Sequence, residues 1–543
     1  MALAHELGPT DVPLLDETIG ANLERTAARF GDREALVSCH QGVRLTYREL
    51  NEAVDRLARG LLAAGLQVGD RVGIWSPNYA EWTLTQFATA KIGVVLVNVN
   101  PAYRTSELAY ALNQSGCRWL IAAPSFKTSD YRAMLEEVRP EVPALERAIF
   151  FWTPEWDALV NGSDNVPESR LREVSAGLSA DDAINIQYTS GTTGFPKGAT
   201  LTHRNILNNG YFVGLRQGFS ENDRLCIPVP FYHCFGMVMG NLGCVTHGAT
   251  MVIPSDAFDA GAVLQAVQLE RCTALYGVPT MFIAELGHPD FETFDLSSLR
   301  TGVMAGSPCP VEVMKQCVDR MHMGEVTICY GMTETSPVST QTEAGDSLHH
   351  RTSTVGRVHP HVEIKVVDPS SGRTLGRGEP GEFCTRGYSV MRGYWNDPER
   401  TAEAIDGDGF MHTGDLATMD EDGYVNIVGR IKDMIIRGGE NVYPREVEEF
   451  LYTHPDIADV QVIGVPDVRY GEELMAWIQV REGASLSEDD VRKYCQGRIA
   501  HYKVPRYIKF VSDFPMTVTG KVQKFLMREQ AKEELGLQDE RTA

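Results

Sequence analysis

The stretch from Tyr188 to Gly198 gathers small hydroxyl residues and glycines around one lysine. Glycines let the backbone curl until its N–H groups converge on an anion, while hydroxyls and an ammonium add donors and charge. The spacing is not that of a Walker loop, because Phe195 and Pro196 stand before the lysine. We predict a phosphate-binding loop of another kind, with a glycine-rich surface turn as the alternative. The residues that would bind the phosphates are Thr189, Ser190, Gly191, Thr192, Thr193, Gly194 and Lys197.

Small and polar residues also follow two predicted strands farther along the chain. Gly302–Ala305 and Val326–Tyr330 have strand patterns, and each ends in glycine or hydroxyl residues. Open α/β sheets bind their ligands at such strand ends. His233 lies in the apolar stretch 228–240, where a single histidine is either a buried core residue or part of a site.

Alternating strand and helix patterns would position these residues. Apolar residues at three- and four-residue steps predict a helix from Tyr47 to about Gly65, and strand, helix and strand follow between Asp70 and Val99. This order is typical of a doubly wound α/β sheet. Residues 153–182 are rich in polar residues and glycine, so we predict a surface connection there. Beyond Val355, short alternating segments with Gly, Pro and Asp turns predict an antiparallel β subdomain.

The last hundred or so residues have a pattern of their own. A helix is predicted at 445–454, strands at 460–463 and 476–480, and a helix from Ser487. We therefore predict an α/β protein with a large N-terminal domain, residues 1–431, that includes the β subdomain. Residues 432–543 would form a small mobile α+β lid, with a hinge near Lys432.

Composition limits the classes of function. At 543 residues the chain is too long for one ordinary core, and its 43% hydrophobic content is that of a globular enzyme. A formal charge of −23 argues against a nucleic-acid or anionic-membrane binder. The 11 cysteines lack metal-binding spacing and fit reduced thiols. Without a leader pattern or a membrane-spanning apolar run, we expect a cytoplasmic protein.

Taken together, six motifs resemble those of the adenylate-forming (AMP-binding) superfamily, which holds acyl- and aryl-CoA synthetases, luciferases and peptide-synthetase adenylation domains. The resemblance covers nearly the whole chain and is strongest to the fatty acyl-CoA synthetases, including the medium-chain type. The residues that carry it are Tyr188–Gly198, Tyr330–Thr335, Thr413–Asp415, Gly429–Asp433, Arg437–Asn441 and Pro515–Lys521.

The resemblance implies two half-reactions that use ATP, Mg²⁺ and CoA. A carboxylate attacks the α-phosphate to give an acyl-adenylate and pyrophosphate, and the CoA thiol then displaces AMP. Lys521 resembles the catalytic lysine that bridges carboxylate and α-phosphate, and Glu334 resembles the magnesium ligand. Lys197 becomes a phosphate contact or a loop anchor.

The remaining roles follow from the same resemblance. Thr333 would act with the phosphate loop, and His233 would line the space between carboxylate and α-phosphate. Asp415 would bind the ribose hydroxyls, because a carboxylate can accept two hydrogen bonds from a diol. Arg437 is expected to be solvated. The other nucleotide- and CoA-binding residues implied are Arg430 at the ribose, Gly306, Tyr330, Gly331 and Met332 at the adenine, and Gly438 and Gly439 at the CoA channel.

These residues predict an ATP-dependent acyl-CoA ligase for an apolar carboxylic acid, most simply a medium- or long-chain fatty acid. No lysine or arginine occurs in Phe231–Gly240, which argues against a second carboxylate on the substrate. Alternatives are an aryl-CoA ligase and an acyl-AMP ligase that loads a carrier protein, although the insertion typical of the latter is absent between Lys432 and Glu446. A non-catalytic nucleotide-binding protein and a luciferase-like oxygenase are more remote. No nucleic-acid partner is expected, and a homodimer is left open.

Overall fold

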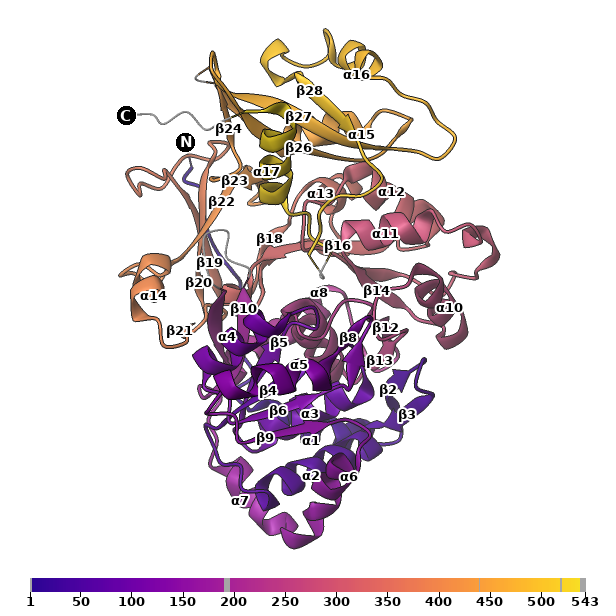
Figure 1. Ribbon diagram of the computed structural model, residues 1–543, viewed down its shortest axis with the longest axis vertical. Coiled ribbons are helices and arrows are strands. Elements are labelled where there is room, and N and C mark those ends of the chain that lie inside the picture. Colours follow the sequence, from indigo (N-terminus) through magenta and orange to yellow (C-terminus); the bar gives the residue numbers. More distant parts are fainter. Residues whose placement is uncertain (1, 190–195, 439, 518–519, 538–543) are drawn as a thin grey trace.

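The computed structural model describes residues 2–189, 196–438, 440–517 and 520–537 (Figure 1). Two large sheets form the body of the molecule, a smaller antiparallel sheet lies beside them, and the C-terminal residues form a separate layer at the top of the view. The predicted α/β class, with a β subdomain and a C-terminal α+β unit, is confirmed.

The first large sheet has seven strands and carries the strand that leads into the predicted phosphate loop. Its inner strands are parallel, whereas the loop joins two antiparallel strands, which the sequence did not predict. In order across the sheet the strands are β21 (Gly393–Tyr394), β11 (Lys197–Thr202), β10 (Ala183–Thr189), β5 (Val95–Val99), β4 (Arg71–Trp75), β6 (Trp119–Ala122) and β9 (Arg147–Phe150).

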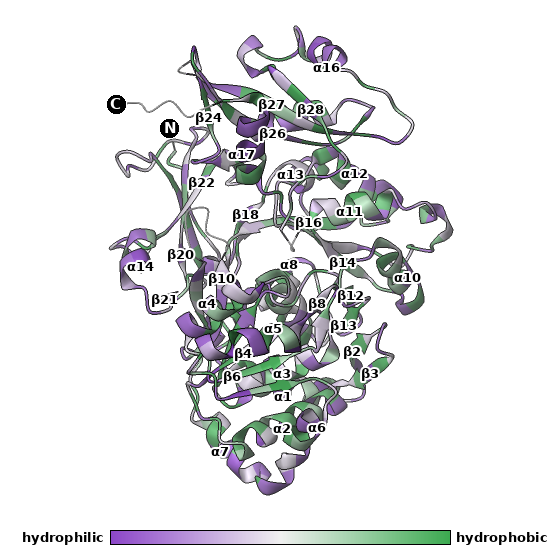
Figure 2. Cartoon of the chain, viewed as in Figure 1, coloured by the Kyte–Doolittle hydropathy of each residue, from purple (hydrophilic) through white to green (hydrophobic). Residues whose placement is uncertain are grey.

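Helices bury the faces of this sheet. The predicted helix at residue 47 is α2 (Tyr47–Ala63), which begins with a capping box formed by Thr46 and Glu49. Helix α3 (Ala80–Lys91) is buried over most of its surface, and it lies among the hydrophobic residues coloured green in Figure 2. Helices α4 (Thr105–Ser115) and α5 (Tyr131–Val138) cover neighbouring strands.

Two short helices occupy the range that was predicted to be a surface connection. They are α6 (Pro154–Asn161), capped by Thr153, and α7 (Glu168–Ala176). The prediction of residues 153–182 as a connection was wrong. Each helix buries only one or two apolar residues, Trp156 and Leu159 in the first and Leu171 in the second, so the helical period is hidden by polar residues.

The second large sheet has nine strands. Six central strands, β16, β15, β14, β12, β13 and β2, are parallel. The strands β17 and β18 at one end and β3 at the other pair in antiparallel fashion. The order is β18 (Arg357–Val358), β17 (Val338–Gln341), β16 (Glu325–Gly331), β15 (Thr301–Met304), β14 (Ala274–Gly277), β12 (Arg224–Cys226), β13 (Thr250–Ile253), β2 (Glu34–Ser38) and β3 (Val43–Thr46).

Helix α8 (His203–Arg216) contacts β11 of the first sheet and β17 of the second, and therefore joins the two sheets. It also packs on the buried π-helix η3 (Phe235–Leu242), which the apolar sequence there did not predict. Other helices that contact this sheet are α9 (Gly243–His247), α10 (Ala260–Glu270), α11 (Pro279–Leu286), α12 (Val311–Arg320) and α13 (Leu348–Ser353), while α1 (Ile19–Phe30) packs on α2, α3 and α9.

The predicted β subdomain is a five-stranded antiparallel sheet. An N-terminal strand, β1, adds to its edge, because His5–Leu7 pairs with residues 363–365. The order is β1 (His5–Leu7), β19 (Val362–Val367), β20 (Gly381–Gly387), β22 (Met411–Met419) and β23 (Val425–Arg430).

The C-terminal unit is a five-stranded sheet with two hydrophobic clusters of its own. The domain boundary and hinge near Lys432 stay predictions, since no observation tests them. The elements are β24 (Ile435–Arg437), β25 (Glu440–Val442), α15 (Pro444–Tyr452), β26 (Ile457–Asp467), β27 (Gly471–Val480), α16 (Glu488–Cys495), β28 (Tyr507–Phe510) and α17 (Lys524–Leu535).

All 11 cysteines are free thiols, and 10 of them are buried, as expected for reduced structural residues. Among the helices of the described residues, none is both long enough and apolar enough to cross a membrane.

Candidate active site

The strands β14, β15 and β16 run in parallel, so their carboxyl ends meet at one edge of the nine-stranded sheet. Gly306 follows β15 with a φ of +93°, a conformation that favours glycine. At the end of β16, a methyl group on Gly331 would lie 1.7 Å from the carbonyl oxygen of Pro337. Only glycine therefore allows the chain to turn through Tyr330 and Met332 into the short helix η5 (Thr333–Thr335).

Glu334 lies in η5 and is 4% exposed. Its Oε1 atom accepts a hydrogen bond of 2.8 Å from the hydroxyl of Tyr394, and that hydroxyl accepts one of 2.9 Å from Lys197 Nζ. Burial, together with the neighbouring Glu334 carboxylate, raises the pKa of Tyr394, so the phenol keeps its proton. Three distant segments thus meet in a chain of lysine, tyrosine and glutamate.

The second oxygen of Glu334, Oε2, has no hydrogen-bond partner among the residues that the structure describes. Mg²⁺ in nucleotide sites is typically held by one or two carboxylate oxygens, phosphate oxygens and water. A buried carboxylate with one uncommitted oxygen, linked through Tyr394 to the end of the predicted phosphate loop, fits this ligand set.

A second group of potential metal ligands lies near the start of β22. His412 Nδ1 is 2.9 Å from Glu382 Oε2, His412 Nε2 is 3.4 Å from Asp406 Oδ2, and Cys384 Sγ is 3.5 Å from His412 Nδ1. Burial raises the pKa of Cys384 to about 12, so the thiol is protonated at neutral pH. The imidazole is already shared between two carboxylates, and this arrangement is an internal polar cluster that needs no ion.

Asp415 lies on β22 directly opposite Arg430 on β23. Asp415 Oδ1 is 3.3 Å from Arg430 Nε, and Asp415 Oδ2 accepts a hydrogen bond of 2.6 Å from the Tyr330 hydroxyl. Burial raises the pKa of Asp415, while Arg430 and Tyr330 oppose that shift. The structure therefore brings the predicted ribose residues to the end of β16.

Lys521 reaches this cluster from the C-terminal unit. A methyl group on Gly306 would lie 3.7 Å from Lys521 Cε, and the preceding Gly520 carbonyl accepts a bond of 3.4 Å from Thr280 Oγ1 at the start of α11. Its ammonium has no ion-pair or hydrogen-bond partner within the described ranges. Burial lowers the pKa of Lys521 below its ordinary value, with Asp415 and Glu334 acting in the opposite direction.

His233 belongs to the same cluster. Burial first, and the nearby Lys521 ammonium second, lower the pKa of His233 to about 3, so the ring is neutral at physiological pH. Nδ1 accepts a hydrogen bond of 3.1 Å from the Phe235 N–H, which places the ring proton on Nε2. The neighbouring Cys234 Sγ lies 4.0 Å from Thr333 Oγ1, so this loop packs against η5.

The phosphate loop connects β10 to β11. Its first and last residues, Thr189 and Lys197, are directly paired across the two strands, and the Thr189 hydroxyl donates a bond of 3.4 Å to the Lys197 carbonyl. The predicted phosphate ligands Ser190, Gly191, Thr192, Thr193 and Gly194 lie outside the described residues.

Of the two glycines predicted for CoA, the structure describes Gly438. The Gly438 N–H donates a bond of 2.7 Å to the Tyr470 carbonyl within the C-terminal unit, and Gly439 lies outside the described residues. Lys432 is exposed. Arg437 forms two bonds, of 2.7 and 2.8 Å, with the buried carboxylate of Glu473, so its expected solvation was wrong.

The cluster at the strand ends thus contains Lys521, His233, Glu334, Asp415 and Arg430. Sequence reasoning missed Tyr394, which links two of the predicted groups. Tyr394 stands in Gly393–Tyr394–Trp395, where the only signal is a pair of aromatic residues, and such a pair also suits a hydrophobic core.

The sequence matches a family over most of its length. Residues 23–395 match AMP-binding enzyme, and residues 446–521 match AMP-binding enzyme C-terminal domain. YngI from Bacillus subtilis (strain 168) is 49% identical, over 96% of this chain and 99% of its own. Medium-chain acyl-CoA ligase ACSF2, mitochondrial, from Danio rerio is 46% identical, over 98% of this chain and 91% of its own.

Solved structures share the same fold. The anthranilate CoA ligase AuaEII in complex with anthranoyl-AMP is similar with a TM-score of 0.88 and 28% identity, over 97% of this chain and 99% of that chain. ATP-bound MatB from Rhodopseudomonas palustris has a TM-score of 0.84 and 31% identity, over 96% of this chain and 100% of that chain. Sequence and structure agree that the chain belongs to the AMP-binding enzyme family.

Proposed function

We propose that this protein is an AMP-forming acyl-CoA ligase that converts a carboxylic acid, ATP and CoA into acyl-CoA, AMP and pyrophosphate. The observation that carries the proposal is the place of Lys521. This lysine comes from the C-terminal unit, has no partner among the described residues, and lies among the carboxylates and the histidine at the strand ends. Relatives whose names state acyl-CoA ligation support the same activity.

In the first half-reaction a carboxylate oxygen attacks the α-phosphorus, and pyrophosphate leaves with the electron pair of the broken P–O bond. The negative charge on the reacting oxygens is what the protein must stabilise. Lys521 is suited to bridge the carboxylate and the α-phosphate. The Nε2–H of His233 is suited to donate to the same region, because this ring is neutral and its Nδ1 is already engaged.

Other residues hold the nucleotide. Asp415 accepts bonds from the ribose hydroxyls and would exchange its Tyr330 partner, Arg430 supports that carboxylate, and Gly306 with the Gly331–Met332 backbone lines the adenine. The loop from Thr189 to Lys197 and the hydroxyl of Thr333 contact the phosphates. Bound Mg²⁺ would neutralise phosphate charge, with Glu334 Oε2 as its protein ligand.

In the second half-reaction the CoA sulfur attacks the acyl carbon, AMP leaves and the thiol proton is lost. We propose that the C-terminal unit moves about a hinge near Lys432 between the two steps, at the boundary of residues 1–431 and 432–543. That movement would withdraw Lys521 and bring Gly438 and Gly439 to the CoA channel. Glycines suit the close approach of a thin pantetheine arm.

The acid is proposed to be apolar, with a medium-chain fatty acid as the first choice. All residues of the π-helix η3 are buried and none is charged, so a second carboxylate would find no partner there. Several vertebrate relatives are named medium-chain acyl-CoA ligase. Their names also state a mitochondrial location, whereas the sequence led us to expect a cytoplasmic one; cell fractionation decides this point, and gel filtration decides whether a homodimer forms.

A pyrophosphate-release assay over short-, medium- and long-chain fatty acids and aryl acids tests the proposal. Medium-chain acids should release pyrophosphate, and CoA should then convert the adenylate into a thioester. Release with a carrier protein as the only competent acceptor would indicate an acyl-AMP ligase, and preference for aryl acids an aryl-CoA ligase. No release with any acid would contradict the proposed activity.

A further inference from the structure

The hydroxyl of Tyr394 stands between two charged groups that belong to different parts of the ATP site. It accepts a hydrogen bond from Lys197 Nζ at 2.9 Å and donates one to Glu334 Oε1 at 2.8 Å. The Lys197 ammonium also lies 4.3 Å from the centre of the tyrosine ring. A phenol can serve a cation and an anion at once because it has both an acceptor oxygen and a donor proton.

The backbone around Tyr394 is attached to both segments as well. Strand β21 pairs with β11, which begins at Lys197, and the Trp395 N–H donates a bond of 2.7 Å to the Gly198 carbonyl. On the other side, the Met391 N–H donates a bond of 2.8 Å to the Glu334 carbonyl. The tyrosine is therefore held in register with the end of the phosphate loop and with η5.

We propose that Tyr394 is a positioning residue for bound Mg·ATP: it sets the distance between Lys197 and Glu334 and engages Oε1, so that Oε2 is the oxygen left for the cation. The proposal rests on the proposed function and adds a residue to it. Without the hydroxyl, the ammonium and the carboxylate lose their link, and the Glu334 side chain can rotate away from the orientation that Mg²⁺ requires.

If Tyr394 had only a structural role, its ring would be sufficient and its hydroxyl would not be needed. The ring is buried, and a surface cavity of about 540 Å³ lies against β21 and the start of α14 (Pro398–Ala404). An alanine at this position would extend that cavity and weaken the fold. Tyr394→Phe keeps the ring and the cation–π contact and removes only the hydroxyl, so it separates the two roles.

The test is titration calorimetry of a non-hydrolysable ATP analogue into Tyr394→Phe, with and without Mg²⁺. Loss of a hydrogen bond to a charged group should weaken binding of the Mg²⁺ complex about tenfold. Binding of AMP, which needs neither the loop nor the metal, should be unchanged. Tyr47→Phe is the matched control, because that buried hydroxyl, at the start of α2, donates to the Ala249 carbonyl at 2.6 Å and takes no part in the proposed ATP site.

A double-mutant cycle with Lys197→Met distinguishes the proposed link between the two residues from a general weakening of nucleotide binding. If tyrosine and lysine act as one unit, the double variant binds the Mg²⁺ complex no more weakly than the weaker single variant. Additive losses, or equal losses for AMP and the Mg²⁺ complex in Tyr394→Phe, would overturn the proposal. Failure of the wild-type protein to form any acyl-adenylate would instead overturn the proposed function.

Discussion

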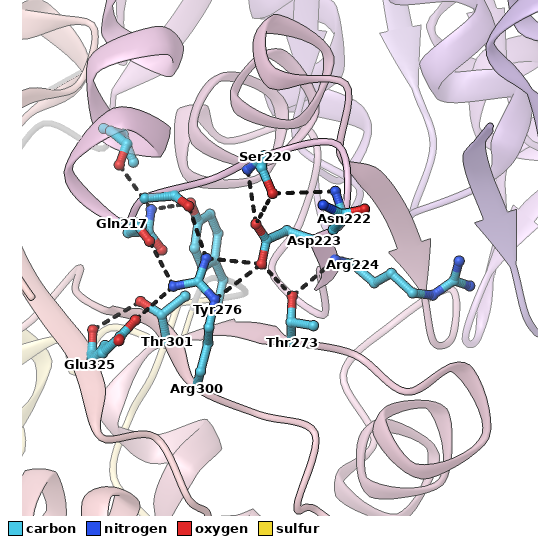
Figure 3. Close-up of polar contacts among 12 residues, drawn as sticks. Gln217, Ser220, Asn222, Asp223, Arg224, Thr273, Tyr276, Arg300, Thr301 and Glu325 are labelled. Carbon is cyan, nitrogen blue, oxygen red and sulfur yellow. Dashed lines mark hydrogen bonds and ion pairs between the residues drawn. The ribbon is translucent and has the colours of Figure 1, made fainter. Parts of the chain in front are cut away.

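The two ends of strands β14, β15 and β16 use charge in opposite ways. At the amino ends, Arg300 donates to Asp223 at 2.9 Å and to Glu325 at 2.7 Å, and Asp223 also accepts from the Thr273 hydroxyl at 2.8 Å (Figure 3). At the carboxyl ends the Lys521 ammonium has no partner among the described residues. The same sheet therefore carries a closed polar network at one end and uncommitted groups at the other.

The difference separates charges that pair with each other within the fold from charges that we propose to bind a ligand. A buried charge without a partner costs free energy, so a protein retains one where a ligand will supply the partner. Asp223 and Arg300 satisfy each other and join β12 to β15. In the proposed function, Lys521 and His233 instead offer an ammonium and a ring N–H to the substrates, and Glu334 Oε2 offers a carboxylate oxygen to the cation.

The largest effect is expected from Lys521→Ala. Removing the cation that stabilises the reacting oxygens should lower the rate of acyl-adenylate formation by about 10³-fold. Thioester formation from supplied acyl-AMP should change little, because that step has no developing charge at the α-phosphate. The two rates are measured separately, by pyrophosphate release and by acyl-CoA formation.

Lys509→Ala is the control for Lys521→Ala. Lys509 lies in the same C-terminal unit and pairs with Glu534 at 2.5 Å on its surface, and its loss should leave both rates near the wild-type values. Equal loss of both half-reactions in Lys521→Ala would show that the lysine supports the fold, as charges at the amino ends do.

At the amino ends, Arg300→Ala should affect stability and leave nucleotide binding unchanged. The change leaves Asp223, whose side chain is 6% exposed, without its cation. The free energy of unfolding should fall by about 3 kcal/mol, measured by urea denaturation. AMP affinity, measured by calorimetry on the folded variant, should match the wild type.

The exposed pair of Arg271 and Asp295 offers a matched comparison, because both side chains are more than half exposed. Arg271→Ala should cost below about 1 kcal/mol. A weaker AMP affinity in Arg300→Ala would show that the network at the amino ends also affects nucleotide binding, which contradicts the proposed difference between the two ends.

Sequence patterns located the carboxyl-end site better than the amino-end network. The site residues stand in short motifs that resemble those of a known family, so roles for Glu334 and Asp415 could be predicted before their geometry was known. Arg300 and Asp223 stand in no motif, and their pairing depends on which strands are neighbours in the sheet. A short motif identifies residues that are close in the sequence. It does not show which strands are neighbours in the sheet.

The same reason explains what else was missed. Tyr394 acts on Lys197 across 197 positions of the chain, and β1 joins a sheet formed mainly by residues beyond 360. The helices α6 and α7 were missed for another reason, since few of their residues are buried. Periodicity reveals an element through its buried face, and long-range pairing leaves no such trace.

The smallest effect is a difference in pH dependence between the two ends. Burial lowers the pKa of Lys521 below its ordinary value, and adenylation requires the protonated amine. We therefore expect kcat/KM for adenylation to fall as the pH rises, and to do so at a lower pH than it would if Lys521 had the pKa of a solvated lysine. His233, with a pKa of about 3, does not titrate in this range. The alkaline decrease should therefore be present in pyrophosphate release and absent from thioester formation with supplied acyl-AMP. Its appearance in both steps would assign it to a group other than Lys521, and the proposed role of the Lys521 ammonium at the carboxyl ends would fail.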